Sequence, residues 1–92
     1  MNFEAEVRVL LKPSVNDPQG LSIARGLHAL GFDEVTGVRA GKLLQVRLAA
    51  EDRAAAEAAV ERMCERLLAN PVIEQYTFTL TELPAEAPAH VP

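Results

Sequence analysis

Alternation of apolar and polar side chains early in the sequence constrains the fold more than any other feature. Every second residue from Phe3 to Leu11 is apolar, and three charged residues lie between them. Successive side chains of a β-strand point to opposite faces, so this pattern predicts a strand over residues 3–11 with one apolar face. Such a face must be covered by a second layer of structure. The chain is therefore expected to form a layered fold.

A helix is predicted after this strand by its starting and ending residues. Asp17 can accept a backbone N–H at a helix start, and Pro18 suits the first helical position, where no N–H is needed. We therefore expect a helix over residues 18–30, ended by Gly31 in a left-handed conformation. Its apolar stripe consists of residues at helical spacing, namely Ile23, Leu27 and Leu30.

Two strands joined by a hairpin are expected next. Residues 35–39 and 42–48 both have strand-like patterns, and Ala40-Gly41 separates them. A tight hairpin turn requires a positive φ angle, which Gly41 would supply. On this interpretation, a Gly41→Val substitution strains the turn and disturbs the hairpin.

A second helix and a last strand complete the predicted elements. Residues 52–69 are rich in Ala, Glu, Arg and Leu, which favour a helix. Asn70 is expected to end this helix in a left-handed conformation, and Pro71 to prevent its continuation. The β-branched and aromatic residues that follow predict a strand over residues 72–81.

The predicted order β-α-β-β-α-β belongs to the α+β class and favours a ferredoxin-like, or split βαβ, fold. In this arrangement a four-stranded antiparallel sheet carries two helices on one face. Residues 1–81 are expected to form this one domain. Residues 82–92 contain three prolines among Ala and Glu, and we expect a flexible tail there.

Composition narrows the class of function. The net charge is −4 and only 4% of the residues are aromatic, which opposes binding to the phosphates and bases of nucleic acids. A 92-residue chain has a thin core of its own, so a partner surface is expected. The single cysteine, the absence of an apolar run of ~20 residues and the lack of a signal segment predict a cytoplasmic protein without membrane contact.

The residue types that carry chemistry do not form a recognisable catalytic or metal-binding set. His28 and Cys64 fall within predicted helices, where packing accounts for them better than catalysis does, and His90 lies in the predicted tail. One cysteine and two distant histidines lack metal-ligand spacing. Lys42 follows a lone glycine and does not complete a phosphate-binding loop. We therefore expect no catalytic residue, metal or bound cofactor in this chain.

Three sequence blocks, taken in order, resemble the PurS family, the small subunit of phosphoribosylformylglycinamidine synthase. The first is Asp17-Pro18-Gln19-Gly20, and the second is the predicted hairpin with Val38-Arg39 and Gly41-Lys42. The third comprises Cys64, Leu67, Leu68, Ala69, Asn70, Val72, Ile73, Glu74 and Tyr76. The resemblance covers residues 6–76 and implies a role in purine biosynthesis.

The resemblance also implies partners and a division of labour. In that family a glutaminase subunit, PurQ, releases ammonia from glutamine. A large subunit, PurL, uses this ammonia with ATP and Mg to make phosphoribosylformylglycinamidine. The small subunit is a homodimer that holds the two together and supports ammonia transfer. The resemblance implies that this chain is a non-catalytic adaptor of a ligase complex, with dimers or tetramers as its own assembly.

Candidate interface or structural residues come from the three blocks and from the strands. They are Asp17, Pro18, Gly20, Arg39, Gly41, Lys42, Leu43, Asn70 and Ile73. Leu10, Leu43 and Ile73 point away from the main apolar faces of their predicted strands and are expected to be buried between chains. Arg39, Lys42 and Arg47 are expected to form a polar rim around them, to meet an acidic partner surface or to be solvated.

An amino-acid-binding regulatory module of the ACT type is the main alternative. The Asp17-Pro18-Gln19-Gly20 loop and the same element order also resemble that family. Its loop would bind a free amino acid at the start of the helix. This alternative does not account for the hairpin or for the block that follows Cys64. An RNA-binding module of the same topology lacks stacking aromatic residues.

Overall fold

The part of the chain that the structure describes forms three strands and three helical segments. The structure, a computed structural model, describes residues 1–84. In chain order the elements are β1 (Asn2–Leu11), α1 (Pro18–Ala29), β2 (Gly41–Ala49), α2 (Arg53–Met63), the π-helical turn η1 (Cys64–Leu68) and β3 (Glu74–Leu83). The predicted α+β class and both predicted helices are confirmed. Within the described residues, every helix is too short or too polar to span a bilayer.

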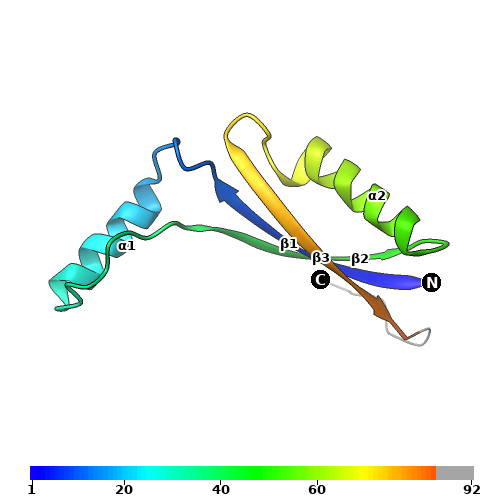
Figure 1. Cartoon of the computed structure of the whole chain (residues 1–92), viewed down its shortest axis with the longest axis horizontal. Helices are drawn as coiled ribbons and strands as arrows, with labels where there is room; N and C mark the ends of the chain where they lie inside the picture. Colours follow the sequence, from blue (N-terminus) through cyan, green and yellow to red (C-terminus); the bar gives the residue numbers. More distant parts are fainter. Residues whose placement is uncertain (85–92) are drawn as a thin grey trace.

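β1 is the central strand of an antiparallel sheet, with β2 on one side and β3 on the other (Figure 1). Val7 of β1 lies opposite Leu44 of β2 and Phe78 of β3. The inward-facing residues of β1 are at most 1% exposed, and they are Phe3, Ala5, Val7 and Val9. Burying one large apolar side chain contributes roughly 1.5–3 kcal/mol, so this row anchors the core.

α2 covers the apolar face of β1 with side chains spaced four residues apart. Asp52 caps the helix by accepting the Ala55 N–H at 2.8 Å. Ala56, Val60 and Cys64 are fully buried in the same cluster as the β1 row. A helix is ~10 Å wide and strands are ~4.8 Å apart, so one helix covers about two strands. The inward-facing residues of β2 therefore stay half-buried, and they are Leu44, Val46 and Leu48.

The second helix ends in a π-helical turn, in which the Ala69 N–H bonds to the Cys64 carbonyl at 3.0 Å. The expected left-handed conformation of Asn70 is wrong, because no non-glycine residue among residues 1–84 has a positive φ. Instead, the Asn70 side chain accepts the Val72 N–H at 3.0 Å, and its own N–H donates to Glu74 Oε1 at 2.7 Å. These local bonds hold the turn that leads into β3.

The last strand starts and ends two residues later than the pattern predicted, because the turn after Asn70 occupies residues 71–73. Glu82 and Leu83, which the sequence placed in the tail, pair with Phe3 and Asn2 of β1. The rest of the predicted tail, residues 85–92, lies outside the residues that the structure describes.

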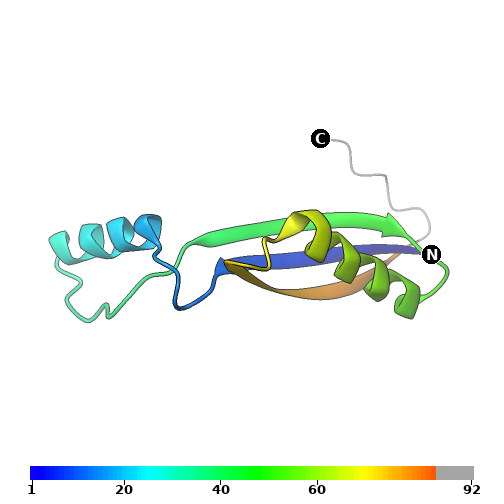
Figure 2. The same ribbon diagram turned by 90° about the horizontal axis from the view of Figure 1, so that it is seen from above.

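α1 stands apart from the sheet, which corrects the expectation of two helices on one face. Figures 1 and 2 show α1 and α2 at opposite ends of an elongated molecule, with only α2 against the sheet. The longest dimension is 50 Å and the radius of gyration is 16.9 Å. A compact domain of this length would have a radius of gyration of about 12 Å. The chain is therefore far more extended than a closed ferredoxin-like domain.

The predicted strand over residues 35–39 does not join the sheet, so within residues 1–84 the sheet has three strands and not four. These residues form no regular element and lead directly into β2 without a hairpin (Figure 1). Among the described residues, the only positive φ is that of Gly31, at +94°. The predicted end of the first helix at Gly31 is thus confirmed, whereas the turn at Gly41 is wrong.

Gly41 is required by close packing and not by a turn. It lies opposite Leu10 in the register between β1 and β2. A Cβ atom on Gly41 would lie 2.2 Å from the Val9 carbonyl oxygen and 2.6 Å from a methyl carbon of Leu10. Real Cβ atoms do not approach backbone oxygens so closely, so any larger residue would push β2 away from β1.

We expect Gly41→Val to lower the free energy of unfolding by about 1–3 kcal/mol, because it forces the two strands apart. Urea unfolding followed by circular dichroism would measure the change. Gly26→Ala is the matched control, because a Cβ there meets no atom within 4 Å and α1 gains a better helix former. Equal stability of Gly41→Val and the parent chain would contradict the packing argument.

Candidate functional site

Asp17 connects the two ends of the segment that carries α1. We name residues 12–40 the arm, because they project beyond the sheet as one unit (Figure 1). The Asp17 carboxylate accepts the Gly20 N–H at 3.0 Å and the Ala40 N–H at 2.8 Å. The side chain is buried, with 7% of the residue exposed. A single carboxylate thus caps α1 and fixes the segment that returns from it to β2.

The environment of Asp17 favours its ionised form. The Gly20 N–H, followed by the Ala40 N–H, lowers the pKa of the Asp17 carboxyl below its ordinary value of 3.8. The Arg39 guanidinium lowers this pKa further, while partial burial opposes these effects. Asp17 is therefore a carboxylate at neutral pH with both oxygens already hydrogen-bonded.

Arg39 holds the opposite side of the same connection. Its Nη2 atom donates to the carbonyl oxygens of Leu11 at 3.1 Å, Lys12 at 2.8 Å and Val15 at 3.3 Å. These carbonyls belong to the outgoing chain between β1 and α1, and Arg39 belongs to the returning chain before β2. Arg39 is thus engaged within the arm, which argues against the predicted role in a polar rim.

Gly20 allows the returning chain to pass directly against α1. A Cβ atom on Gly20 would lie 2.3 Å from the Val38 carbonyl oxygen, so no larger residue fits there without a shift. His28 Nε2 lies 2.8 Å from the Val35 carbonyl oxygen, at the far end of the helix. An open cleft of about 610 Å³ lies between α1 and the chain that leads to and from it, with Leu21 and His28 among its lining residues.

A second group of predicted residues lies where the sheet meets the arm. Leu10, Leu43 and Ile73 are 39%, 61% and 39% exposed. Leu43 pairs with Arg8, two positions from Leu10 along β1, and the Ile73 carbonyl accepts the Lys12 N–H at 2.8 Å. The structure therefore brings these three apolar residues to one end of the sheet, as an exposed apolar cluster.

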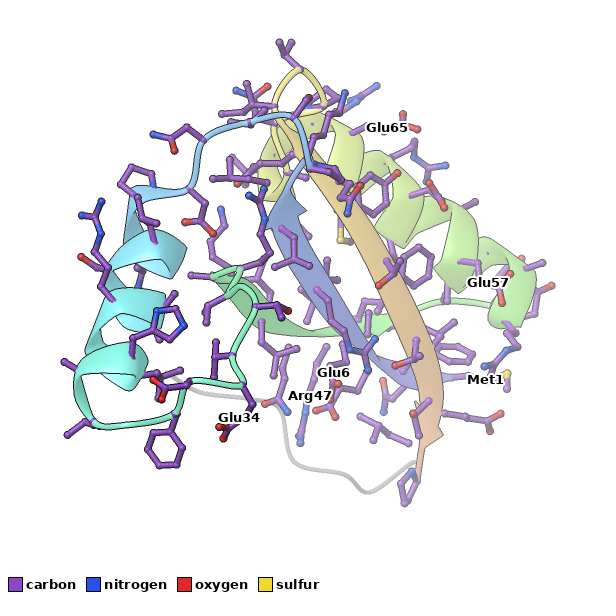
Figure 3. All side chains as sticks on the ribbon, turned by 60° about the vertical axis from the view of Figure 1, so that its left-hand side comes forward. Met1, Glu6, Glu34, Arg47, Glu57 and Glu65 are labelled. Carbon is purple, nitrogen blue, oxygen red and sulfur yellow. The ribbon has the colours of Figure 1, made fainter. Side chains whose placement is uncertain are left out.

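The rest of the sheet face opposite α2 is charged but balanced. Arg47 pairs with Glu4 at 3.0 Å across the strands, and Arg8 pairs with Glu6 at 2.8 Å. Figure 3 shows Glu6 and Arg47 on the sheet, and Glu57 on the outer surface of α2. Exposed pairs of this kind contribute little to stability, so their importance lies in shaping a surface without excess charge.

The remaining predicted residues take structural positions. Pro18 is the first residue of α1, and Asn70 forms the turn before β3. The Lys42 ammonium lies 3.9 Å from a Glu74 carboxylate oxygen, and its side chain is 56% exposed. The sequence placed Val38 and Ala40 at a hairpin and did not reveal their contacts with Gly20 and Asp17. Gly20, a glycine in the first turn of a helix, was the feature of the sequence that could have indicated close approach of another backbone segment.

Titratable groups near α2 are held in their protonated forms. Burial, aided by nearby carboxylates, raises the pKa of the Cys64 thiol. The Tyr76 hydroxyl donates to Glu61 Oε2 at 2.7 Å, and this bond raises the pKa of Tyr76 to about 12. Within residues 1–84 no three His, Cys, Asp or Glu side chains come together in a way that could hold a metal ion.

Comparisons with known proteins identify the family. The family model described as PurS, phosphoribosylformylglycinamidine (FGAM) synthase, matches residues 4–82. The chain belongs to the PurS family. The Synechocystis subunit PurS is 44% identical over 82 residues, which are 89% of this chain and 82% of that protein. The Bacillus subtilis subunit PurS is 40% identical over 84 residues, which are 91% of this chain and 99% of that protein.

Solved structures agree with this assignment. A chain from the structure of PurLQS from Thermotoga maritima matches with a TM-score of 0.81 at 32% identity, over 88% of this chain and 99% of that chain. B. subtilis PurS matches with a TM-score of 0.78 at 41% identity, over 87% of this chain and 99% of that chain. This PurS-family chain is therefore a subunit of FGAM synthase, which acts in purine biosynthesis.

We expect Asp17→Asn to destabilise the chain at pH 7, because an amide NH₂ cannot accept the second backbone N–H. The folded-state pKa of Asp17 is lowered, so its stabilising effect is complete above pH 3.8 and is lost as the pH falls through the folded value. Urea unfolding of the parent and of Asp17→Asn should therefore differ at pH 7 and converge as the pH falls below 3.8.

Asp33→Asn is the control for this comparison, because Asp33 is exposed at the far end of the arm. It should leave the unfolding midpoint at pH 7 unchanged. A constant difference between the parent and Asp17→Asn from pH 7 to the acid limit would contradict the assigned role of the carboxylate.

Proposed function

We propose that this chain is the non-catalytic adaptor of FGAM synthase, which holds the glutaminase subunit PurQ and the synthetase subunit PurL together and supports ammonia transfer between them. The single observation that carries the proposal is the match over 99% of a chain from T. maritima PurLQS. The chain has a mass of only 10.0 kDa. A subunit of this size contributes to such a complex mainly through the surface that contacts the other subunits.

The chemistry of the described residues supports a role without catalysis. Release of ammonia from glutamine requires an activated nucleophile, and Cys64 is instead a buried thiol with a raised pKa. ATP-dependent amidation requires Mg²⁺ held by oxygen ligands, for which residues 1–84 gather no set of carboxylates. We therefore assign ATP and Mg²⁺ to the complex and no cofactor to this chain.

The subunit surface offers one apolar cluster to a partner. Leu10, Leu43 and Ile73 are exposed together on a face whose remaining charges are paired. Exposed leucines surrounded by polar residues are typical of protein contacts. Lys42 lies beside Leu43 and is suited to the polar rim of such a contact, whereas Arg39 is already engaged within the arm.

Self-association is the second part of the proposal. The extended shape leaves α1 without a sheet to cover, and both β2 and β3 are sheet edges. Proteins rarely leave long sheet edges open, so a second copy is the expected cover. We propose a homodimer, with pairing of dimers into tetramers as a further step. The cytoplasmic location expected from the sequence stays a prediction.

Amino-acid binding of the ACT type has little support at the Asp17 loop. Both carboxylate oxygens of Asp17 already accept N–H groups from Gly20 and Ala40. The Gly20 backbone is also covered by the returning chain at Val38. The features that resembled a ligand loop are thus used for capping and close packing.

Reconstitution tests the adaptor function directly. We expect purified PurL and PurQ to form FGAM from glutamine only when this chain is added. FGAM formation by PurL from ammonium salts should proceed without it. An effect of the chain on neither reaction, with no binding to either subunit, would overturn the proposal.

Leu43→Glu should weaken the complex by placing a charge in the apolar cluster. We expect about a tenfold increase in the concentration of the chain that gives half-maximal glutamine-dependent activity, which corresponds to ~1.4 kcal/mol. Gln45→Glu is the matched control, because it adds the same charge to the same face of β2. Equal effects of the two variants would remove the apolar cluster from the proposed contact.

A further inference from the structure

The outer edge of β3 is long and lacks the usual protection of an exposed strand. Within residues 1–84, β3 pairs with β1 on one side only, and the register runs without a bulge from Glu74 to Leu83. Residues 76–82 contain neither proline nor lysine. Proteins commonly protect an open edge with a bulge, a proline or a lysine. This edge is therefore suited to pairing with another strand.

Alternate residues of β3 direct their backbone hydrogen-bonding groups away from β1. The Lys12 N–H donates to the Ile73 carbonyl at 2.8 Å, one step beyond the pair of Leu11 and Glu74. Bonded and non-bonded pairs alternate in an antiparallel ladder, so the even-numbered residues of β3 point their groups outward. These residues are Tyr76, Phe78, Leu80 and Glu82. None of their N–H groups bonds to another segment of residues 1–84.

The first residue of α2 reaches this outward side of β3. Arg53 Nη2 donates to the Leu80 carbonyl oxygen at 2.5 Å. This bond requires the Leu80 carbonyl to point away from β1, as the alternation of the ladder indicates. The Arg53 Nε atom also lies 3.5 Å from Glu57 Oε1. α2 thus satisfies one carbonyl of the edge and leaves the neighbouring outward groups open.

A row of carboxylates lies beside the same edge. Glu61 accepts the Tyr76 hydroxyl at 2.7 Å, which places this side of α2 next to β3. Glu57 and Glu65 lie four residues before and after Glu61, and Figure 3 shows both on the helical segment beside β3. Glu57 is paired with Arg53, whereas neither Glu61 nor Glu65 has a cation within 4.0 Å among residues 1–84. This side of the molecule therefore carries unbalanced negative charge.

The side chains of the edge favour long basic partners. Tyr76 and Phe78 are only half-buried on the face of β3 that lies under α2. The hydrocarbon stem of a lysine or arginine can cover such rings while its charged end reaches Glu61 or Glu65. The opposite face of β3 is polar and exposed, and it carries Thr77, Thr79 and Thr81. An added strand would thus need basic side chains on one face and polar ones on the other.

We infer that the open edge of β3 binds an extended basic segment of another FGAM synthase subunit. This inference deepens the adaptor function and rests on it. The segment adds a strand along residues 76–82, where backbone hydrogen bonds supply affinity. Its lysine or arginine side chains meet Glu61 and Glu65, which selects a basic sequence and fixes its register.

Charge opposes a second copy of this chain at the same place. Pairing of two β3 edges would bring the row of Glu61 and Glu65 in one copy towards the same row in the other. Like charges facing each other across paired strands are destabilising, and the chain has a net charge of −4. A basic segment from a different protein removes this repulsion and neutralises the row.

Neutralising the carboxylates tests the charge contact. The combined substitution Glu61→Gln and Glu65→Gln removes two charges, and glutamine at position 61 can still accept the Tyr76 hydroxyl. At low salt, the concentration of the chain that gives half-maximal glutamine-dependent activity with PurL and PurQ should rise about tenfold. The difference from the parent should shrink as salt is added, because salt screens charge pairs.

Asp33→Asn combined with Glu34→Gln is the matched control, because it removes the same charge from exposed residues at the far end of the arm. This control should keep the parent value at every salt concentration. A parent value for Glu61→Gln with Glu65→Gln at low salt would overturn the proposed charge contact.

Residue-resolved amide hydrogen exchange of the unaltered chain tests the added strand itself. On addition of PurL and PurQ, the outward N–H groups should exchange at least about 100-fold more slowly. These groups belong to Tyr76, Phe78, Leu80 and Glu82. The N–H groups that bond to β1 should exchange slowly with and without the other subunits, and they belong to Gln75, Thr77, Thr79 and Thr81.

The outcomes separate this edge contact from the adaptor function. Unchanged exchange at the outward groups in an active complex would overturn the edge contact and leave the adaptor function standing. Protection of these groups in the chain alone, rising with its concentration, would assign the edge to self-association and also overturn the inference. Failure of the chain to bind PurL or PurQ would overturn the adaptor function and the edge contact together.

Discussion

The pair of hydrogen bonds to the Asp17 carboxylate determines the shape of this protein. One bond starts α1 and the other fixes Ala40, so the segments that lead into and out of the helix are held against each other beyond the sheet. Without this tie, the return from α1 to β2 would be a loop that could fold back at many points. With it, the backbone at Ala40-Gly41 stays extended instead of turning back in a hairpin. α1 is therefore kept away from the core of its own chain.

The core itself is small and depends on one strand. β1 supplies four side chains that are at most 1% exposed, and α2 and the turn η1 that follows it pack in the same core. This division separates two tasks within 92 residues. The sheet with α2 provides stability, while the arm and the opposite sheet face provide surface. A subunit of a larger synthase needs this kind of surface more than it needs an internal site, which agrees with its proposed role as an adaptor.

Local patterns in the sequence predicted the elements well and their assembly only in part. The alternation of β1, the Asp17-Pro18 start and the Gly31 end of the first helix depend on neighbouring residues, and all three are confirmed. The direction of the chain at Gly41 depends instead on contacts with β1 and Asp17, which are far away in sequence. A glycine that permits close approach looks the same in sequence as a glycine that permits a turn.

The candidate site shows the same limit. The positions of Leu10, Leu43 and Ile73 in the predicted strands indicated that they point away from the apolar core. The structure brings these three residues to one end of the sheet, where they are exposed. The bonds from Arg39 to three carbonyls could not be foreseen, because they depend on the path of residues 11–15 beside the returning chain. Pairwise contacts of this kind become visible only with coordinates.

The π-helical turn at Cys64–Leu68 has a consequence for how chain length can vary in this family. A π-helical turn holds one residue more than the α-helical turn it replaces, and the extra residue is accommodated locally. Here it lies beyond the buried contacts of Ala56 and Val60, just before the bonds around Asn70 that start β3. A relative with one residue fewer between Cys64 and Ala69 could therefore form a regular α-helix and keep the same core and strand register. Alignments of the family should accept a one-residue gap at this place more readily than anywhere else in the second helix.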